Sequence, residues 1–254
     1  MNPDLSGYYE NSKRLQYNPH SSFLKKRTGA KRLIAFEDRF EEVKKILERL
    51  ISQEDRIPLK ILDIGVGDGI YEAILEDDIK KKCDFFGIDI SKKQAARAKQ
   101  YLKEIKIVDI NAENLPYKDN YFDIVIASEI LEHVFYPEKV LSEARRVLKR
   151  NGFVILTYPN SSSLQFRLGI FIKGRSPLLN YPENSEHIRF FSSSDIQGLT
   201  NDNFKLLKKT GVGSFLFDKW NFLFRIPMPR FLQILGNRLL PNLALGNLLV
   251  LQKK

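Results

Sequence analysis

Short apolar runs alternate with amphipathic stretches through the first two thirds of the chain. The apolar runs predict strands at residues 59–64, 85–90, 105–108, 122–127 and 153–158. In the intervening stretches apolar residues recur every three or four positions, which is typical of helices with one buried face. These predicted helices occupy residues 31–52, 70–82, 91–102 and 137–149. Apolar strands that alternate with helices favour a parallel sheet covered by helices on both faces.

The last third of the chain follows a different pattern. One further helix is predicted at residues 192–201, and two late strands at residues 204–217 and 243–251. Aromatic and basic residues fill two segments, 161–190 and 218–241, that interrupt the alternation. We therefore expect one α/β domain over residues 1–254, with these two insertions on the substrate side. Its other parts are an N-terminal arm and helix at 1–52 and a ligand-binding core at 53–160.

Composition and charge restrict the class of protein. With 254 residues, 43% of them hydrophobic, the chain can bury a large core, and its single cysteine, Cys83, excludes an internal disulfide. The net charge is +10, and residues 203–254 hold nine lysines and arginines against the single acid Asp218. Such a basic end suits nucleic acid, an anionic membrane or an acidic substrate, and equally a solubilising surface. Because neither a secretory signal nor an apolar run of about 18 residues is present, we expect a cytoplasmic protein.

Glycines follow the first predicted strand directly, in the segment 62–69. They allow a tight turn at the carboxyl edge of the sheet and let a ligand approach the backbone. They are Gly65, Gly67 and Gly69. Asp89 ends the second strand, where a carboxylate can accept hydrogen bonds from ribose hydroxyls. A dinucleotide oxidoreductase is the alternative, but its G-x-G-x-x-G pattern would need a glycine at Ile70, and Asp63 before the first glycine is unusual for that class.

Segment 62–69 resembles the first motif of class I S-adenosylmethionine (SAM)-dependent methyltransferases. Segment 87–91 is similar to their second motif, 111–117 to the motif beside the adenine, and 122–128 to the fourth-strand motif. The resemblance implies SAM as the cofactor. It also implies a Rossmann-like, seven-stranded, mostly parallel sheet with helices on both faces and an antiparallel last strand.

The resemblance assigns residues to the cofactor one motif at a time. Asn111 stands where the family has aspartate, and its side-chain oxygen can still accept a hydrogen bond from the adenine amino group. The full set implied for the cofactor is Asp63, Gly65, Gly67, Gly69, Asp89, Ile90, Asn111, Ala112, Glu113, Ser128 and Glu129.

The segment after the fourth predicted strand, 128–133, is similar to that of the ubiquinone-biosynthesis O-methyltransferases. In those enzymes the two acids and the histidine are associated with a divalent metal. The resemblance thus implies a Mg²⁺ site formed by Glu129, Glu132 and His133. The alternative is a Glu-His pair without a metal, in which the histidine caps or packs a helix.

Two histidines are candidates for the base that removes a proton from the acceptor. His133 lies in the segment just described, and His187 lies just before a predicted helix, in a loop that overlooks the substrate pocket in related enzymes. Arg189, two residues later, is the candidate for binding an acidic group of the substrate. The alternative for this loop is a purely structural contact at the entry of the helix.

The two insertions are expected to define the acceptor. Apolar residues interleaved with arginines and lysines suit the headgroup region of an anionic membrane, with a lipid, quinone or lipid-linked glycan as acceptor. The alternatives are a small-molecule acceptor under an ordinary lid, and an RNA or protein acceptor. For nucleic acid, neither an RNA-binding module nor the Asn/Asp-Pro-Pro-Tyr motif is visible. We expect O-methylation, and the non-enzymatic alternative is a methyltransferase-like binding protein without catalysis.

Overall fold

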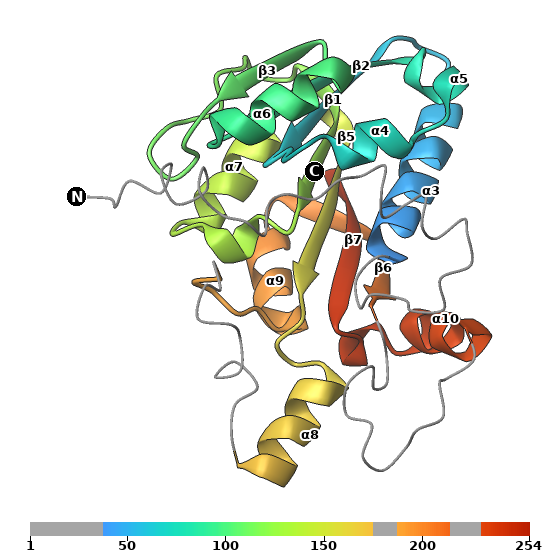
Figure 1. Ribbon diagram of the computed structural model, residues 1–254, viewed down its shortest axis with the longest axis vertical. Helices are drawn as coiled ribbons and strands as arrows, with labels where there is room; N and C mark the ends of the chain where they lie inside the picture. The colour runs from blue at the N-terminus through green and yellow to red at the C-terminus, as the bar shows by residue number, and fades with distance from the viewer. Residues whose placement is uncertain (1–37, 175–186, 214–229) are drawn as a thin grey trace.

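The computed structural model describes residues 38–174, 187–213 and 230–254 (Figure 1). The strands are β1 (Leu59–Ile64), β2 (Cys83–Asp89), β3 (Glu104–Ile107), β4 (Phe122–Ser128), β5 (Leu148–Pro159), β6 (Phe204–Val212) and β7 (Gly246–Lys253). The helices are α3 (Asp38–Ser52), α4 (Ile70–Ile74), α5 (Asp77–Lys80), α6 (Lys92–Ala98), α7 (Pro137–Val147), α8 (Leu164–Lys173), α9 (Ser193–Thr200) and α10 (Arg230–Leu239). Three short 3-10 helices complete the described elements: η2 (Lys99–Tyr101), η3 (Leu131–His133) and η5 (Pro241–Leu243).

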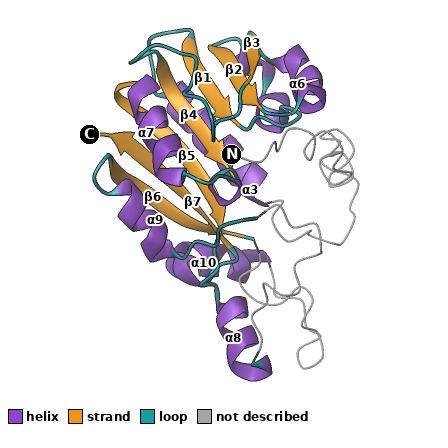
Figure 2. Ribbon diagram, turned by 90° about the vertical axis from the view of Figure 1, so that its left-hand side faces the viewer, coloured by secondary structure: helices purple, strands orange, loops and turns teal. Residues whose placement is uncertain are grey.

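The strands form one twisted, seven-stranded sheet in the order β3-β2-β1-β4-β5-β7-β6 (Figure 2). Each neighbouring pair from β3 to β5 is parallel, whereas β7 pairs antiparallel with both β5 and β6. The predicted mostly parallel sheet with an antiparallel last strand is therefore confirmed. Parallel strands all end at one edge of the sheet, and ligands of such sheets bind beyond that edge.

Helices cover both faces of the sheet, as the apolar strands predict. In β1, Leu62 and Ile64 face a core that includes α7 and α9, whereas Leu59 and Ile61 face a core that includes α3, α4 and α5. The same alternation continues in β4. Because both faces are covered, side chains of successive positions are buried, and residues 124–127 of β4 form a continuous apolar run.

Local signals set several helix ends where the sequence places them. Ser91 caps α6, with its Oγ accepting a hydrogen bond from Gln94 N, and Pro137 occupies the first turn of α7. The predicted helix 70–82 is instead two short helices, because the chain becomes extended at Leu75. The start of the predicted helix 31–52 and the end of the predicted strand 204–217 lie outside the described residues.

Candidate active site

A pocket with about 730 Å³ of open space lies at the carboxyl ends of β1, β2 and β4. Several residues assigned to the cofactor or to catalysis from the sequence line it, namely Gly65, Gly67, Asp89, Ile90, Asn111, Glu129 and His133. Its apolar lining includes Ile88, Val108 and Ile130. The pocket thus combines an apolar lining with the carboxylates of Asp89, Asp109 and Glu129, which suits a nucleoside-sized ligand.

The glycine turn after β1 brings the backbone to the pocket wall. Gly65 and Gly67 have φ angles of 73° and 57°, in the left-handed region that favours glycine. A Cβ at Gly65 would come within 2.7 Å of the Ile130 side chain, whereas a Cβ at Gly67 would meet nothing within 4 Å. The positive φ therefore favours glycine at both positions, and Gly67 leaves open space where a ligand can approach.

Asp89 is held in place by the backbone on both sides of the pocket. Its Oδ2 accepts a hydrogen bond from Gly67 N at 2.8 Å, and its Oδ1 accepts one from Ser91 N at 2.8 Å. A carboxylate oxygen can accept more than one hydrogen bond, so this anchoring is compatible with binding two ribose hydroxyls. The glycine turn and the predicted ribose carboxylate are thereby fixed to each other.

Some residues that the motifs assign to the cofactor lie outside the pocket lining. Asp63 is only 2% exposed within β1, where burial and the nearby carboxylates of Glu72 and Asp89 hold its pKa well above the usual range. Gly69 begins α4, and a Cβ there would come within 3.3 Å of Ala98. Asp63 and Gly69 thus lie at the two ends of the glycine turn and do not line the pocket. Ala112, Glu113 and Ser128 also lie outside the lining, and their direct contact with the cofactor stays a prediction.

The contacts of Asn111, the residue assigned to the adenine, were not expected from the sequence. The side-chain oxygen of Asn111 accepts a hydrogen bond from Phe135 N at 2.8 Å, so it is already engaged within the protein. Asp109 lines the pocket next to it and accepts a hydrogen bond from Asn111 N at 2.9 Å. Sequence reasoning missed Asp109. The signal was available, because Asp109 follows the third strand as Asp89 ends the second.

A chain of polar contacts connects β4 and β5 with α3 beside the pocket. Ser128 Oγ lies 2.5 Å from Tyr71 Oη and 2.7 Å from Thr157 Oγ1. Thr157 donates a hydrogen bond to Glu129, whose other oxygen pairs with Arg39 at 3.2 Å. Glu129 itself has a φ of 52°, a strained conformation of the kind that clusters at functional sites.

Glu132 lies between the two candidate histidines. Its carboxyl is 1% exposed, and Oε1 lies 3.9 Å from Nε2 of His133 and 3.9 Å from Nε2 of His187. The two imidazole rings meet edge to face, with centroids 4.7 Å apart. Among the described residues, neither oxygen of Glu132 has a hydrogen-bond partner. The structure thus brings His133 and His187 together, although 53 residues separate them in the sequence.

Burial and nearby charges set the protonation of this cluster. Burial, together with the charge of Glu129, holds the pKa of Glu132 well above its usual range, although Arg39 opposes the shift. Burial and the positive charge of Arg39 lower the pKa of His187 from 6.5. At neutral pH His187 is therefore neutral and can accept a proton, and Glu132 favours its protonated form more than an ordinary carboxyl does.

The backbone of η3 holds the His187 segment in place. Ile188 N and Arg189 N both donate hydrogen bonds to the Glu132 carbonyl, at 2.9 and 3.2 Å. The guanidinium of Arg189 donates to the carbonyls of Val134 and Phe135. Arg189 was expected to bind a substrate group. These contacts show that it holds the loop that carries His187 in place. Its role toward substrate stays a prediction.

The metal site implied by the resemblance does not match the arrangement. The cluster that brings potential metal-binding atoms within 4.8 Å of one another is Glu132, His133 and His187, without Glu129. Glu129 instead pairs with Arg39, whose positive charge competes with a cation. Mg²⁺ prefers oxygen atoms in an octahedral arrangement, and a set with two imidazole nitrogens does not provide them. The predicted set of Glu129, Glu132 and His133 stays a prediction that this arrangement does not support.

Comparison with known proteins agrees with this geometry. Residues 62–156 match the model of a methyltransferase domain family. An uncharacterized protein of Methanocaldococcus jannaschii is 38% identical over 49% of this chain and 50% of its own length. Demethylmenaquinone methyltransferase of Thermotoga maritima is 27% identical over 66% of this chain and 75% of its own. The mitochondrial ubiquinone biosynthesis O-methyltransferase of Saccharomyces cerevisiae is 28% identical over 68% and 58%.

The fold has relatives among solved structures as well. A SAM-dependent methyltransferase of Archaeoglobus fulgidus superimposes with a TM-score of 0.56 at 17% identity, over 93% of this chain and all of that one. At this identity the likeness concerns the fold. The chain spans about half the length of the first curated relatives it matches. Residues 62–156 therefore match a methyltransferase domain, and the strand order, the glycine turn and Asp89 agree with the fold of SAM-dependent methyltransferases.

Proposed function

We propose that this protein transfers the methyl group of SAM to a hydroxyl oxygen of a hydrophobic, quinol-type acceptor. One observation carries the proposal: two imidazoles, those of His133 and His187, lie edge to face, and His133 lines the cofactor pocket. An acceptor hydroxyl must lose its proton as the new bond forms. A base beside the pocket therefore suits O-methylation.

The pocket residues fit SAM. Asp89, fixed by two backbone amides, is placed to accept hydrogen bonds from the ribose, and the open face of Gly67 accommodates close approach of the ligand. Ile88 and Ile130 provide apolar walls for the adenine. When bound, the cofactor supplies an electrophilic methyl group. The protein orients the acceptor, excludes water and accepts the proton.

The histidine cluster can hold that proton in a defined place. His187 is kept neutral by burial and by Arg39, and the clamp through Ile188 and Arg189 fixes its ring against His133. Burial beside both rings raises the pKa of Glu132 and so disfavours a negative charge in the cluster. A positioned base of this kind contributes about 10²–10⁴-fold to a rate.

Relatives with assigned substrates support a quinol-type acceptor. The names of the Thermotoga and yeast proteins refer to menaquinone and ubiquinone, and a relative from Arabidopsis thaliana is a 2-methyl-6-phytyl-1,4-hydroquinone methyltransferase. Such acceptors combine an aromatic hydroxyl with a prenyl chain. Across the described ranges, the helices are too short and too polar for a membrane span. A prenylated acceptor would therefore be met at a membrane surface.

The proposal is tested by separating cofactor binding from methyl transfer. Titration calorimetry should show SAM binding that Asp89→Ala abolishes. Labelled SAM should then methylate a prenylated catechol, with mass spectrometry placing the methyl group on oxygen. Binding without transfer to any of a prenylated catechol, bulk RNA or protein would favour the non-catalytic alternative. Methylation on carbon, or of RNA or protein in preference to the catechol, would overturn the proposed acceptor.

A further inference from the structure

Helix α10 presents its apolar side to solvent. Phe231, Leu235 and Leu239 follow one another at four-residue spacing along one side, and their exposed fractions are 66%, 49% and 68%. Ile234 on the same side is 44% exposed. A helix at the surface of a globular protein normally buries such a stripe against the core. In α10 that stripe is left uncovered.

The opposite side of α10 explains this orientation. Asn237 is 5% exposed, and its side-chain nitrogen donates a hydrogen bond to the carbonyl of Gly213 at 2.9 Å. A Cβ at Gly211 of β6 would come within 3.1 Å of the Asn237 Cα. The helix thus packs on the sheet through a small, polar contact at close backbone approach. Turning the leucines inward would break that contact, so their exposure is built into the packing.

Helix α8 adds a second apolar surface at the same end of the molecule (Figures 1 and 2). Its last turn exposes three consecutive large apolar side chains: Ile170 at 52%, Phe171 at 86% and Ile172 at 63%. Single exposed apolar residues are common on protein surfaces. Large apolar residues gathered on two helices at one end are characteristic of an interaction surface.

The charge around these side chains identifies the partner. Neither α8 nor α10 contains an aspartate or glutamate, and Arg167 and Arg238 are exposed on them. Apolar side chains flanked only by positive charge complement a bilayer with anionic headgroups. A second copy of this chain would bring arginines against arginines, so self-association on this face is disfavoured.

The sheet places this surface beside the active site. Pro159, at the end of β5, pairs with Gly246 at the start of β7, and Val212, at the end of β6, pairs with the same Gly246. The chain therefore leaves toward α8 and returns from α10 at the carboxyl edge of the parallel strands, where the pocket lies. We propose that the exposed sides of α8 and α10 dock on an anionic lipid bilayer, with the active-site edge of the sheet toward the membrane.

Vesicle sedimentation of the full-length protein tests this proposal without acceptor or cofactor, so its outcome is separate from that of the methyl-transfer assay. We expect enrichment on vesicles of phosphatidylcholine mixed with phosphatidylglycerol over phosphatidylcholine alone, and weaker binding at high salt. The variant Leu235→Ser/Leu239→Ser should lose about tenfold or more in partitioning, because each leucine would otherwise leave water. Titration of SAM into this variant should give the wild-type affinity, which shows that it folds.

The matched control is Ile57→Ser/Leu207→Ser. These side chains are similarly exposed, at 58% and 46%, but Ile57 precedes β1 and Leu207 lies in the first half of β6, away from the carboxyl edge. The control should bind vesicles like the wild type. Equal sedimentation with both vesicle types, or equal loss in both variants, overturns the proposal. So does a dimer in solution that the leucine variant converts to monomer, because a second copy would then cover this face.

Discussion

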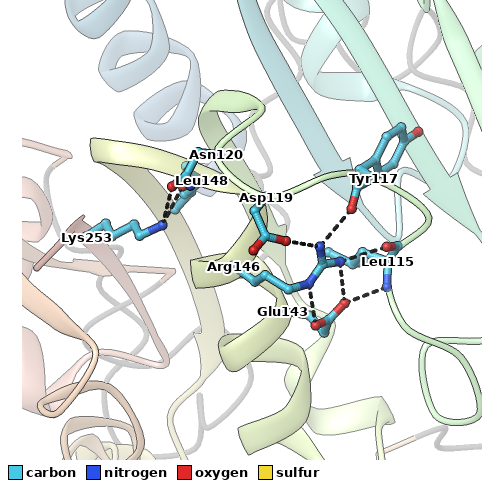
Figure 3. A network of polar contacts seen from close by, with 8 residues as sticks. All are labelled: Leu115, Tyr117, Asp119, Asn120, Glu143, Arg146, Leu148 and Lys253. Atoms are coloured by element: carbon cyan, nitrogen blue, oxygen red, sulfur yellow. Dashed lines mark hydrogen bonds and ion pairs between the residues drawn. The ribbon is translucent and has the colours of Figure 1, made fainter.

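Two glutamates separated by only a few residues, Glu132 in η3 and Glu143 in α7, are treated in opposite ways by the fold. Glu143 accepts hydrogen bonds from Arg146 on both oxygens, each at 2.8 Å, and a third from Leu115 N (Figure 3). These contacts, above all that with Arg146, hold the pKa of Glu143 below its usual range. Glu132 is more deeply buried and has no such partner among the described residues.

The two environments indicate different roles for Glu132 and Glu143. Arg146 also donates to the carbonyls of Tyr117 and Leu115 and to Asp119, so it ties the connection between β3 and β4 onto α7 (Figure 3). That network is saturated and lies outside the pocket lining. A buried carboxyl without hydrogen bonds costs stability, and one beside two imidazoles is of the kind retained at functional sites. The unsatisfied cluster is therefore the better candidate for a functional role than the saturated network.

The variant His187→Ala is expected to have the largest effect on methyl transfer, and it tests whether the unsatisfied cluster is functional. Removing the neutral imidazole from the cluster should lower kcat/KM for a prenylated catechol by about 10²–10⁴-fold, with SAM affinity unchanged. Methyl transfer from labelled SAM and calorimetry measure the two quantities. Ile188→Ala, which changes the exposed neighbouring side chain, should leave both unchanged. A His187→Ala variant with wild-type turnover would remove His187 from the role of base.

The pH dependence of kcat/KM is a second test of the role of His187. Because burial and Arg39 lower the pKa of His187 from 6.5, its neutral form persists below the pH at which an ordinary histidine is half protonated. We expect the acid limb of kcat/KM to have its midpoint below pH 6.5 and to fall about tenfold per pH unit below the lowered pKa. In Arg39→Met, the acid limb should move to higher pH, since one cause of the lowered pKa is gone. A limb that stays in place would contradict the assigned role of Arg39.

The glycine turn and Asp89 could be predicted from the sequence because their signals are local. The glycine turn, Asp89 and the apolar strands are each contained within a few residues, and the strand order follows from the family resemblance. Burial on both faces of the sheet is also readable, because it makes the strands continuously apolar.

The histidine cluster could not be predicted in this way because its contacts join residues that are far apart in the sequence. His187 meets His133, and Arg39 meets Glu129, only after the sheet has formed. Local similarity therefore grouped Glu129 with Glu132, whereas the fold pairs Glu129 with an arginine from α3. The sequence likewise predicts an insertion at residues 218–241 and does not indicate which side of α10 faces the sheet. That choice depends on the fit of Asn237 against Gly211.

A smaller effect is expected from breaking the saturated network. Arg146→Ala leaves Glu143 and two carbonyls without their donor, and should lower the free energy of unfolding by about 2–3 kcal/mol. Denaturant unfolding measures it. The control is Arg145→Ala on the same helix, whose Nε has no hydrogen-bond partner among the described residues, and this variant should change stability much less. Equal losses in both variants would mean that the network of Figure 3 contributes little.

The same substitution at the two glutamates should have opposite signs. Glu132→Gln removes a carboxyl whose folded pKa is raised above 4.5, so it should stabilise the protein by about 1 kcal/mol at neutral pH. That gain vanishes at low pH, where the carboxyl is protonated whether folded or not, and grows as the pH rises above 4.5. Glu143→Gln should destabilise by about 1 kcal/mol, because it weakens the charge-assisted bonds with Arg146. Unfolding at acidic and neutral pH measures both, and matching signs would remove the contrast.

The smallest effect is expected from Mg²⁺. The cluster of Glu132, His133 and His187 offers two nitrogen atoms and a carboxyl whose raised pKa disfavours the carboxylate form, whereas Mg²⁺ prefers oxygen atoms of ionised carboxylates. Titration with Mg²⁺ should therefore give no heat, and methyl transfer should be the same with EDTA as without it. Glu132→Gln is the matched control, since it keeps the shape of the side chain but cannot bind a cation as a carboxylate. Mg²⁺ binding that this variant abolishes would place a cation on Glu132 and make the buried carboxyl a ligand instead of a neutral neighbour of the two histidines.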